Sequence, residues 1–281
     1  MSNKFLHLLF ASSIIACQLL LPNHAKAQTD VDLDPEIGGR LSFTLDKKIT
    51  RGLHVSLEEE VRFDNNFSSF DRFQTTVALS YKVNDNLKLG LGYAMINPYS
   101  SSNNAFKNSR HRLMLDVTGG IRLGNWRLSL KERFQATYRS GEMNLYQNPR
   151  TALILKSRLK LQYKGLRRLE PYASFELRNT LNAPVIVAYY NGTSYITDTY
   201  ATEGDAGWFL DGYSNIFVNR LRGTIGAEYR LTKRSSLDIS LMADYVMDNI
   251  VDANSEGTIL KTYTHETGFV GWLTAGYRYS F

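Results

Sequence analysis

The sequence predicts an all-β fold, a single-chain antiparallel β-barrel that crosses a membrane. Three observations support this prediction. Apolar and polar residues alternate along many segments, short and long connections alternate between these segments, and the last segment ends in aromatic residues. Because successive side chains of a strand point to opposite faces, this alternation is typical of strands with one apolar and one polar face.

The first 27 residues are expected to form a removable secretory signal. Lys4 precedes an apolar run that reaches Cys17, and Ala25-Lys26-Ala27 offers small residues for cleavage. Acylation at Cys17, as in a lipoprotein, is the alternative. The rest of the chain, 28–281, would be one barrel domain. It keeps 31 of the 33 basic residues against 27 acidic ones, because the signal carries Lys4 and Lys26, and its net charge is +4 instead of +6.

Composition excludes several classes of protein. Cys17 is the only cysteine, so the mature chain would have no disulfide and no cysteine-based metal site. No later segment has about 18 consecutive apolar residues, which excludes a transmembrane helix but not a barrel. The modest positive charge argues against nucleic-acid binding. No metal site and no cofactor are expected.

Eleven strands can be assigned along the chain. Each alternating run is longer than the roughly 5–6 residues of a soluble strand, and about 9–11 tilted residues span a bilayer. Ten of the runs are 40–47, 53–63, 75–83, 87–95, 113–123, 126–139, 153–163, 217–229, 237–247 and 269–281, and one further strand is counted between Leu169 and Asn179. Single-chain bacterial barrels have even strand numbers. We therefore expect 12 strands within a range of 10–12, either through a further strand in 28–39 or because one run is split or merged.

The connections between the runs sort into two kinds. The short ones are 47–52, 84–86, 124–125, 165–169 and 231–236, and the long ones are 64–71, 97–108, 140–148, 179–215 and 248–258. Outer-membrane barrels have short periplasmic turns and longer extracellular loops. We therefore assign the short connections to the periplasm and expect a long extracellular loop at about 179–215.

Alternation also assigns the two faces of each strand. Apolar positions such as Leu113, Leu115, Val117 and Leu241 are expected to face lipid, and charged positions are expected to line the lumen. The predicted basic lumen residues are Arg112, Arg122, Lys131, Arg133, Lys156 and Arg158, and the predicted acidic ones are Glu58, Glu60, Asp238 and Asp244. These acids lie on strands that meet where the barrel closes. The basic strands would then lie across the lumen from them.

Two acids break the apolar face. Glu59 and Glu132 fall at positions that alternation assigns to lipid. A β-bulge that resets the register is one explanation, and lateral contact with another protein is the alternative.

The C-terminus carries an aromatic pattern. Tyr277, Tyr279 and Phe281 share one face of the last run. A terminal Phe preceded by alternating aromatics resembles the C-terminal signal read by the barrel assembly machinery. We therefore expect the bacterial cell outer membrane as the location, with outer-membrane lipid and that machinery as partners.

Several stretches together resemble an uncharacterised family of outer-membrane barrels found in Bacteroidota. They are SLEEEVR at 56–62, FDRF at 70–73, LGLGY at 89–93, YQNPR at 146–150, and the segments 153–161 and 171–177. The resemblance covers most of residues 50–281. It implies an outer-membrane location and one barrel domain, and it implies no activity and no catalytic residues.

Three functions are compatible with these features. The separated inward charges favour a narrow, charge-lined channel for small solutes, preferably anions. A closed barrel whose surface loops, above all 189–208, bind a glycan or a protein is the alternative. A lipid-acting enzyme would need a histidine beside a nucleophile and an orienting acid. Because His54, His111 and His265 are not expected to act together, the protein is expected not to be an enzyme. The sequence leaves the oligomeric state open.

Overall fold

The computed structural model describes residues 29–142, 144–145, 147–188, 208–210, 212–253 and 260–281. Over these residues the chain is all-β, and none of them belongs to a helix long and apolar enough to cross a membrane. The strands are β1 (Thr29–Asp32), β2 (Glu36–Thr50), β3 (Leu53–Asp64), β4 (Ser69–Lys82), β5 (Leu87–Ser100), β6 (Ala105–Phe106), β7 (Arg110–Leu123), β8 (Trp126–Arg139), β9 (Thr151–Tyr163), β10 (Leu169–Ala183), β11 (Ile186–Ala188), β12 (Trp208–Leu210), β13 (Asn215–Arg230), β14 (Ser235–Ala253) and β15 (Leu260–Ser280). The predicted signal over 1–27, with Cys17, lies outside the described residues.

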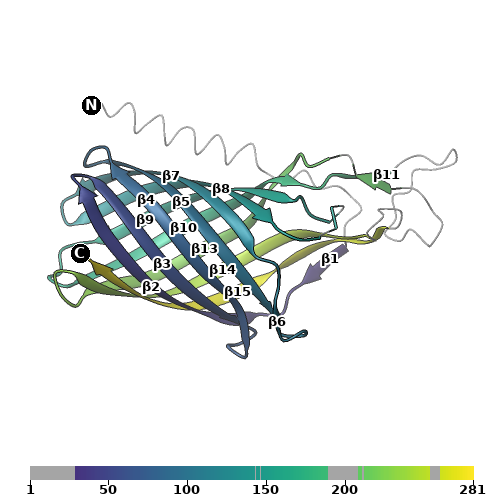
Figure 1. The fold of residues 1–281 in the computed structure, drawn as a ribbon, viewed down its shortest axis with the longest axis horizontal. Coiled ribbons are helices and arrows are strands. Elements are labelled where there is room, and N and C mark those ends of the chain that lie inside the picture. Colours follow the sequence, from purple (N-terminus) through teal and green to yellow (C-terminus); the bar gives the residue numbers. More distant parts are fainter. Residues whose placement is uncertain (1–28, 143, 146, 189–207, 211, 254–259) are drawn as a thin grey trace.

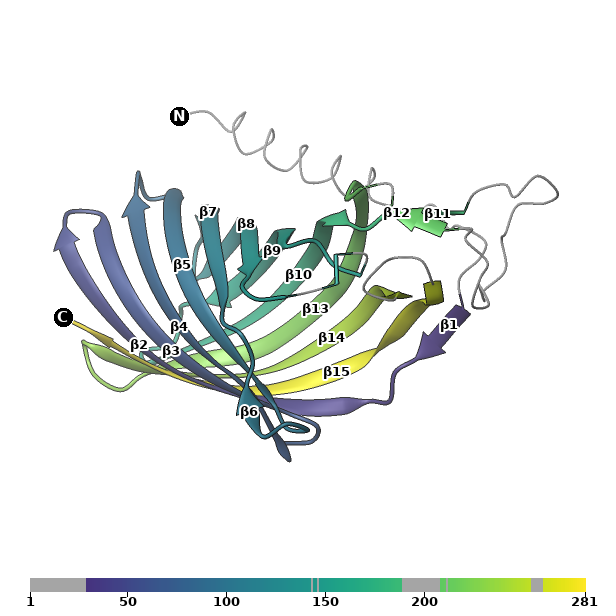
Figure 2. The ribbon, with the colours of Figure 1, turned by 45° about the vertical axis from the view of Figure 1, so that its right-hand side comes forward.

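Eleven long strands close into a barrel (Figures 1 and 2). In the described part of the chain the main sheet has 13 strands, of which the short β1 and β6 lie beyond the wall. Wall strands that follow one another in the chain pair antiparallel, whereas β15 pairs with β2 in parallel. An odd number of strands with alternating directions leaves the first and the last pointing the same way, so the seam has to be parallel.

Eleven wall strands lie within the expected range of 10–12, but the preferred number of 12 and a wholly antiparallel barrel are wrong. β1 does fall within 28–39, but it pairs in parallel with β15, ending with Asp32 opposite Thr267. β2 begins on the same edge of β15, with Glu36 opposite Val270. β1 thus prolongs the edge formed by β2 and adds no strand to the wall. Pro35 lies between them and has no N–H to donate, which interrupts the ladder.

The predicted runs all lie on wall strands, and the structure extends several of them. The run 126–139 coincides with β8, but β4 already begins at Ser69 and β5 continues to Ser100. The connection predicted over 64–71 is only a four-residue turn between β3 and β4, in which the Ser68 N–H donates to the Asn65 carbonyl at 3.0 Å. The short turns gather at the end of the barrel that carries the C-terminus, and the long connections gather at the other end (Figure 1).

The two faces of the wall differ as alternation predicts. Leu113, Leu115 and Leu241 are each more than half exposed, with exposed fractions of 57%, 55% and 56%. A closed sheet can expose such side chains only on its outer face, and the charged residues between them point inward. Trp126 and Tyr138 are exposed near the two ends of β8.

Glu59 and Glu132 lie on this apolar outer face without any change of register. The pairing of β3 with β4 runs unbroken through Glu59 opposite Thr75, and that of β8 with β9 through Glu132 opposite Ser157. The β-bulge explanation is therefore wrong for both residues. Each carboxyl instead accepts a hydrogen bond from the hydroxyl of its cross-strand neighbour, at 2.8 Å from Thr75 and 2.6 Å from Ser157.

The aromatic C-terminus packs at the parallel seam. Tyr277 stacks on Phe43 of β2 with the ring centroids 5.8 Å apart. The Phe281 N–H donates to the Asp46 carbonyl at 2.9 Å, and the Phe281 ring stacks on Tyr279. These aromatic residues therefore help to close the barrel. Their reading by the assembly machinery stays a prediction.

Candidate functional site

The lumen contains a row of four cations across four neighbouring strands. Arg133 on β8 lies opposite Lys156 on β9, Lys156 lies opposite Arg178 on β10, and Arg178 lies opposite Arg220 on β13. We name these four residues the cationic row. Like charges directly opposite one another on neighbouring strands are destabilising. Such a row is not expected from folding stability alone.

A second row lies two residues closer to the short turns. It crosses β8, β9, β10, β13 and β14 and consists of Lys131, Arg158, Glu176, Arg222 and Asp244. We name it the mixed row, because its two acids lie only opposite cations, although Lys131 and Arg158 form a like-charged pair at one end. Opposite charges on neighbouring strands attract. The mixed row therefore stabilises the wall that the cationic row strains.

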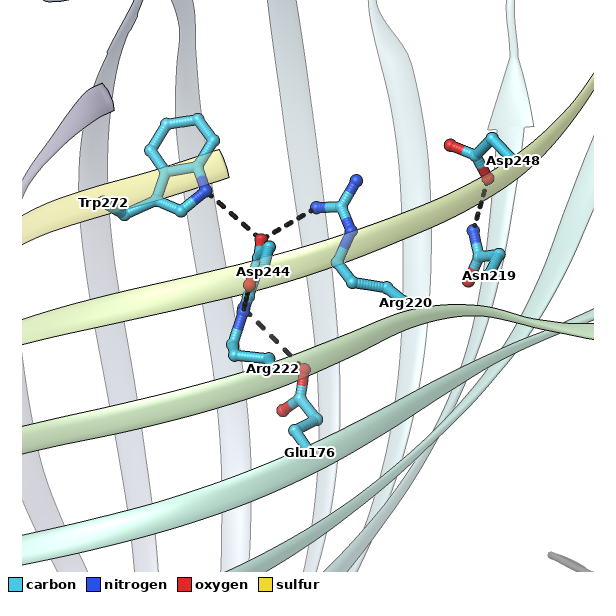
Figure 3. Close-up of polar contacts among 7 residues, drawn as sticks. All are labelled: Glu176, Asn219, Arg220, Arg222, Asp244, Asp248 and Trp272. Atoms are coloured by element: carbon cyan, nitrogen blue, oxygen red, sulfur yellow. Dashed lines mark hydrogen bonds and ion pairs between the residues drawn. The ribbon is translucent and has the colours of Figure 1, made fainter. Parts of the chain in front are cut away.

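Asp244 is the best-satisfied charge of the lumen (Figure 3). Its side chain is fully buried, and Arg222 binds both carboxylate oxygens, at 2.6 and 2.7 Å. Arg220 and the Trp272 indole N–H each donate to it at 3.2 Å. A buried carboxylate is tolerated only when it is paired and hydrogen-bonded. The four donated bonds meet that requirement and tie β13 to β14 and β15.

Asp116 on β7 plays the same part at the other end of the two rows. Arg133 donates to it through two nitrogens, at 2.6 and 2.7 Å, and Lys131 lies 2.7 Å away. Both outer cations of the cationic row are thus held by a carboxylate, Arg133 by Asp116 and Arg220 by Asp244.

The two central cations of the row have no such partner. Lys156 and Arg178 form no ion pair with any residue that the structure describes, and Arg178 Nε is buried without an acceptor. The nearest carboxylates are already engaged. Glu176 lies 3.7 Å from Arg222, and Asp248 accepts a hydrogen bond from Asn219 at 3.0 Å. The centre of the row therefore presents two cations that have no ion pair among the described residues, although Glu176 and Asp248 lie within electrostatic range.

A second group of arginines lines the opposite wall. Arg40 on β2 lies opposite Arg62 on β3, which lies opposite Arg72 on β4. Arg62 donates to Glu60 at 2.5 Å and Arg72 donates to Asp71 at 2.6 Å. Asp71 is the extra residue of β4 at a register shift, and this irregularity places its carboxylate beside Arg72.

The two walls approach each other closely enough to interact. Arg112 on β7, whose Nε donates to Thr137 at 3.0 Å, lies within electrostatic range of Arg62, Arg72 and Arg178. Arg133 is likewise within electrostatic range of Glu58 on β3. Charged side chains of the two walls therefore lie within electrostatic range of one another.

Five of the six predicted basic lumen residues lie in this region: Arg112, Lys131, Arg133, Lys156 and Arg158. Arg122 does not, since it is exposed at the short-turn end of β7, opposite Arg127. Its face agrees with alternation. Alternation does not predict how far along the barrel axis a residue lies from the barrel end.

The predicted acids do not form a separate patch. Glu58 accepts from Thr44 at 3.2 Å and Asp238 accepts from Tyr172 at 2.8 Å. Glu60 and Asp244 bind arginines, as described above. The predicted separation of acids from bases is wrong, because six arginines were not assigned from the sequence: Arg40, Arg62, Arg72, Arg178, Arg220 and Arg222. The same alternation, applied to β2, β3, β4, β10 and β13, would have found them.

The three histidines lie on three different strands, β3, β7 and β15, and each contacts a different partner. His111 contacts the Tyr93 hydroxyl at 2.7 Å, His54 contacts Asp46 at 3.0 Å, and His265 contacts Asn249 at 2.8 Å. Within the described ranges, no group of three His, Cys, Asp or Glu side chains is placed to hold a metal ion.

Fold and site define the class of protein: a closed β-barrel with an apolar outer face and a charged, predominantly basic interior. Residues 41–192, more than half of the chain, match the family model described as "Protein of unknown function (DUF2490)". The chain belongs to this family. The predicted membership of an uncharacterised family is thereby confirmed, while an origin in Bacteroidota stays a prediction. No functionally curated protein matches the chain.

Solved structures that are similar to the chain include two barrel proteins. The NanC porin is 13% identical, with 81% of this chain and 95% of that chain covered and a TM-score of 0.40. OmpT of Vibrio cholerae, described as outer-membrane expressed, is 8% identical, with 76% and 60% covered and a TM-score of 0.32. At these identities the similarity concerns the fold alone.

Proposed function

We propose that the protein is an outer-membrane β-barrel that forms a narrow, charge-lined channel for small anionic solutes. The observation that carries the proposal is the cationic row, whose central residues Lys156 and Arg178 have no carboxylate partner among the described residues. Repulsion between neighbouring cations opposes folding, and an anion between them would relieve it. Rings of charged side chains are a known means of selecting ions in pores.

The outer surface supports the membrane part of the proposal. Leu113, Leu115 and Leu241 belong to an exposed apolar face, with the aromatic residues Trp126 and Tyr138 near strand ends. Such a face suits the hydrocarbon core, and aromatic residues suit its interfaces. Outer-membrane lipid and the barrel assembly machinery are the partners that this location implies.

The neighbouring acids suit passage better than permanent binding. An anion held by Lys156 and Arg178 would lie near Glu176 and Asp248, which already bind other donors. Conduction requires sites that attract an ion enough for entry and still release it. Repulsion between these acids and the anion would lower the affinity of the cationic row for that anion. The protein's role in this proposal is selection by charge and width, without catalysis.

The proposal can be tested by conductance of the refolded protein in a planar bilayer under a salt gradient. We expect a reversal potential that indicates anion preference. In a variant with Lys156→Gln and Arg178→Gln, the reversal potential should shift toward cations, because two positive charges without an ion pair are lost. Neither residue binds a carboxylate, so the change leaves no acid unpaired.

A matched control removes two charges outside the wall. Lys233→Gln with Arg234→Gln alters two exposed cations of the turn between β13 and β14. This control should conduct like the unmodified protein. Different gel mobilities of boiled and unboiled samples would show that each variant is folded. A folded lumen variant with an unchanged reversal potential would contradict the proposal.

The paired charges favour a second candidate. Asp116 and Asp244 each bind two cations, as they would in a closed lumen that supports surface loops. In that case the loop over 189–208 would bind a glycan or a protein. All of this segment except Trp208 lies outside the described residues. Folded protein without conductance, together with surface binding that is lost on deletion of 190–207, would favour this candidate over the channel.

A further inference from the structure

A cavity of about 550 Å³ lies at the end of the barrel that carries the long connections. It is lined by the ends of β5, β7 and β8 and by the connections that follow β5 and β8. Its lining is mostly polar, with Ser100, Lys107, Asn108, Arg110, Arg139 and Asn148 beside the apolar Ala105 and Phe106. The volume falls within the roughly 300–1,000 Å³ of small-molecule sites.

Two unpaired arginines face each other in this cavity. Arg110 on β7 lies directly opposite Arg139 on β8. Neither side chain forms an ion pair or hydrogen bond with a described residue, and Arg139 Nε is buried without an acceptor. Two carboxylates lie near. Asp71 is within electrostatic range of Arg110 but is bound by Arg72, and Glu142 on the cavity lining is exposed.

The walls of the cavity are held in place by bonds that leave the two guanidinium groups free. The Ser140 hydroxyl donates to the Ser109 carbonyl, and the Ser109 hydroxyl donates to Asn97 at 2.6 Å. The backbone N–H of Arg139 donates to the backbone carbonyl of Arg150 at 3.0 Å. A site whose walls are already fixed loses less entropy when a ligand binds.

We infer that this cavity binds a hydroxyl-rich small molecule of sugar size that carries an oxyanion, either a carboxylate or a phosphate. The planar fork of a guanidinium group matches such oxyanions through two parallel hydrogen bonds. The remaining lining supplies hydroxyl and amide groups, such as those of Ser100, Asn108 and Asn148, which suit the hydroxyl groups of a sugar.

Arg110 of the cavity is followed along β7 by a cation of the charged interior. Arg112 follows Arg110 on the inward face of β7 and lies within electrostatic range of Arg178. A solute released from the Arg110–Arg139 pair would next meet Arg112 and then the cationic row. The inference therefore deepens the proposed channel by naming its solute class, and it rests on that proposal only for the direction of passage.

Equilibrium binding to the refolded full-length protein in detergent tests the inference without any need for conductance. The probes are glucuronate, glucose 6-phosphate and glucose. The affinity for each is measured by isothermal titration calorimetry. We expect at least one of the two acidic sugars to bind about tenfold or more tightly than glucose, because charge-assisted hydrogen bonds are strong. Preference for glucuronate would assign a carboxylate ligand, and preference for glucose 6-phosphate a phosphate ligand.

Variants locate the site. Arg110→Gln with Arg139→Gln should weaken binding of the preferred acidic sugar by about tenfold or more. The turn control Lys233→Gln with Arg234→Gln should bind like the unmodified protein. Unchanged affinity in the folded Arg110 and Arg139 variant would overturn the inference, as would equal affinity for glucose. Binding by a protein that does not conduct would sustain this site and contradict only the channel.

Discussion

Asp244 and Arg178 lie on strands two apart in the same wall, yet their electrostatic surroundings are opposite. Asp244 accepts bonds from Arg220, Arg222 and Trp272 (Figure 3), whereas Arg178 lies between Lys156 and Arg220 and has no carboxylate partner among the described residues. A shift of two residues along the strands separates the mixed row from the cationic row. The first region stabilises the barrel, and the second reduces stability where an anion would pass.

The largest effect is expected when the paired region is broken. Asp244→Asn removes the charge that Arg220 and Arg222 share, which leaves Arg220 without an ion pair among the described residues and Arg222 with Glu176 at 3.7 Å. Breaking a buried ion pair by removing one partner lowers the free energy of unfolding by about 3–5 kcal/mol. The change in the free energy of unfolding is measured by urea titration in lipid vesicles. The folded fraction is determined from the gel mobility of unboiled samples.

A second change checks the cause of that loss. Adding Arg222→Met to Asp244→Asn removes one of the stranded cations and should recover part of the lost stability. A double variant as unstable as the sum of the two single variants would show that the two residues are not coupled.

A smaller effect of opposite sign is expected in the cationic row. Arg178→Met removes a charge that faces Lys156 and Arg220 directly, and each like pair costs about 0.2–1 kcal/mol. The free energy of unfolding should therefore rise by about 0.4–2 kcal/mol, while anion preference falls. The same urea titration and the reversal potential measure the two quantities. A destabilised variant would mean that Arg178 has a structural partner.

The smallest effect is expected at an exposed pair on the short-turn side. Lys82 donates to Asp85 at 2.6 Å, and this bond, with the charge of Lys82, lowers the pKa of Asp85. A lowered pKa stabilises the fold above the unfolded pKa, and the contribution is lost as the pH falls through the folded value. Lys82→Met should return the pKa of Asp85 toward its ordinary value in an NMR titration.

The pair should matter little for stability, because exposed ion pairs are screened by water and salt. The urea midpoint of Lys82→Met at neutral pH should match that of the unmodified protein. A clear loss would show that exposure alone does not separate structural from neutral charges in this barrel.

Alternation predicted much of the fold and part of the site. It placed strand 126–139 at the bounds of β8 and put Arg133 and Lys156 on the inward face. It did not reveal that Lys156 lies between Arg133 and Arg178, because face depends on the position along one strand, whereas cross-strand neighbours depend on the register between strands. Arg178 was missed although the register continues to it without a shift.

The sequence by itself determined the strand class, the two faces and the separation of short from long connections, since these follow from the two-residue period and from local turn residues. Only the tertiary structure decided the number of wall strands, the parallel seam between β15 and β2, and the neighbours of each charge. These depend on how segments far apart in the chain are brought into register when the sheet closes. Arg110 and Arg139, 29 residues apart in the chain, face each other for that reason.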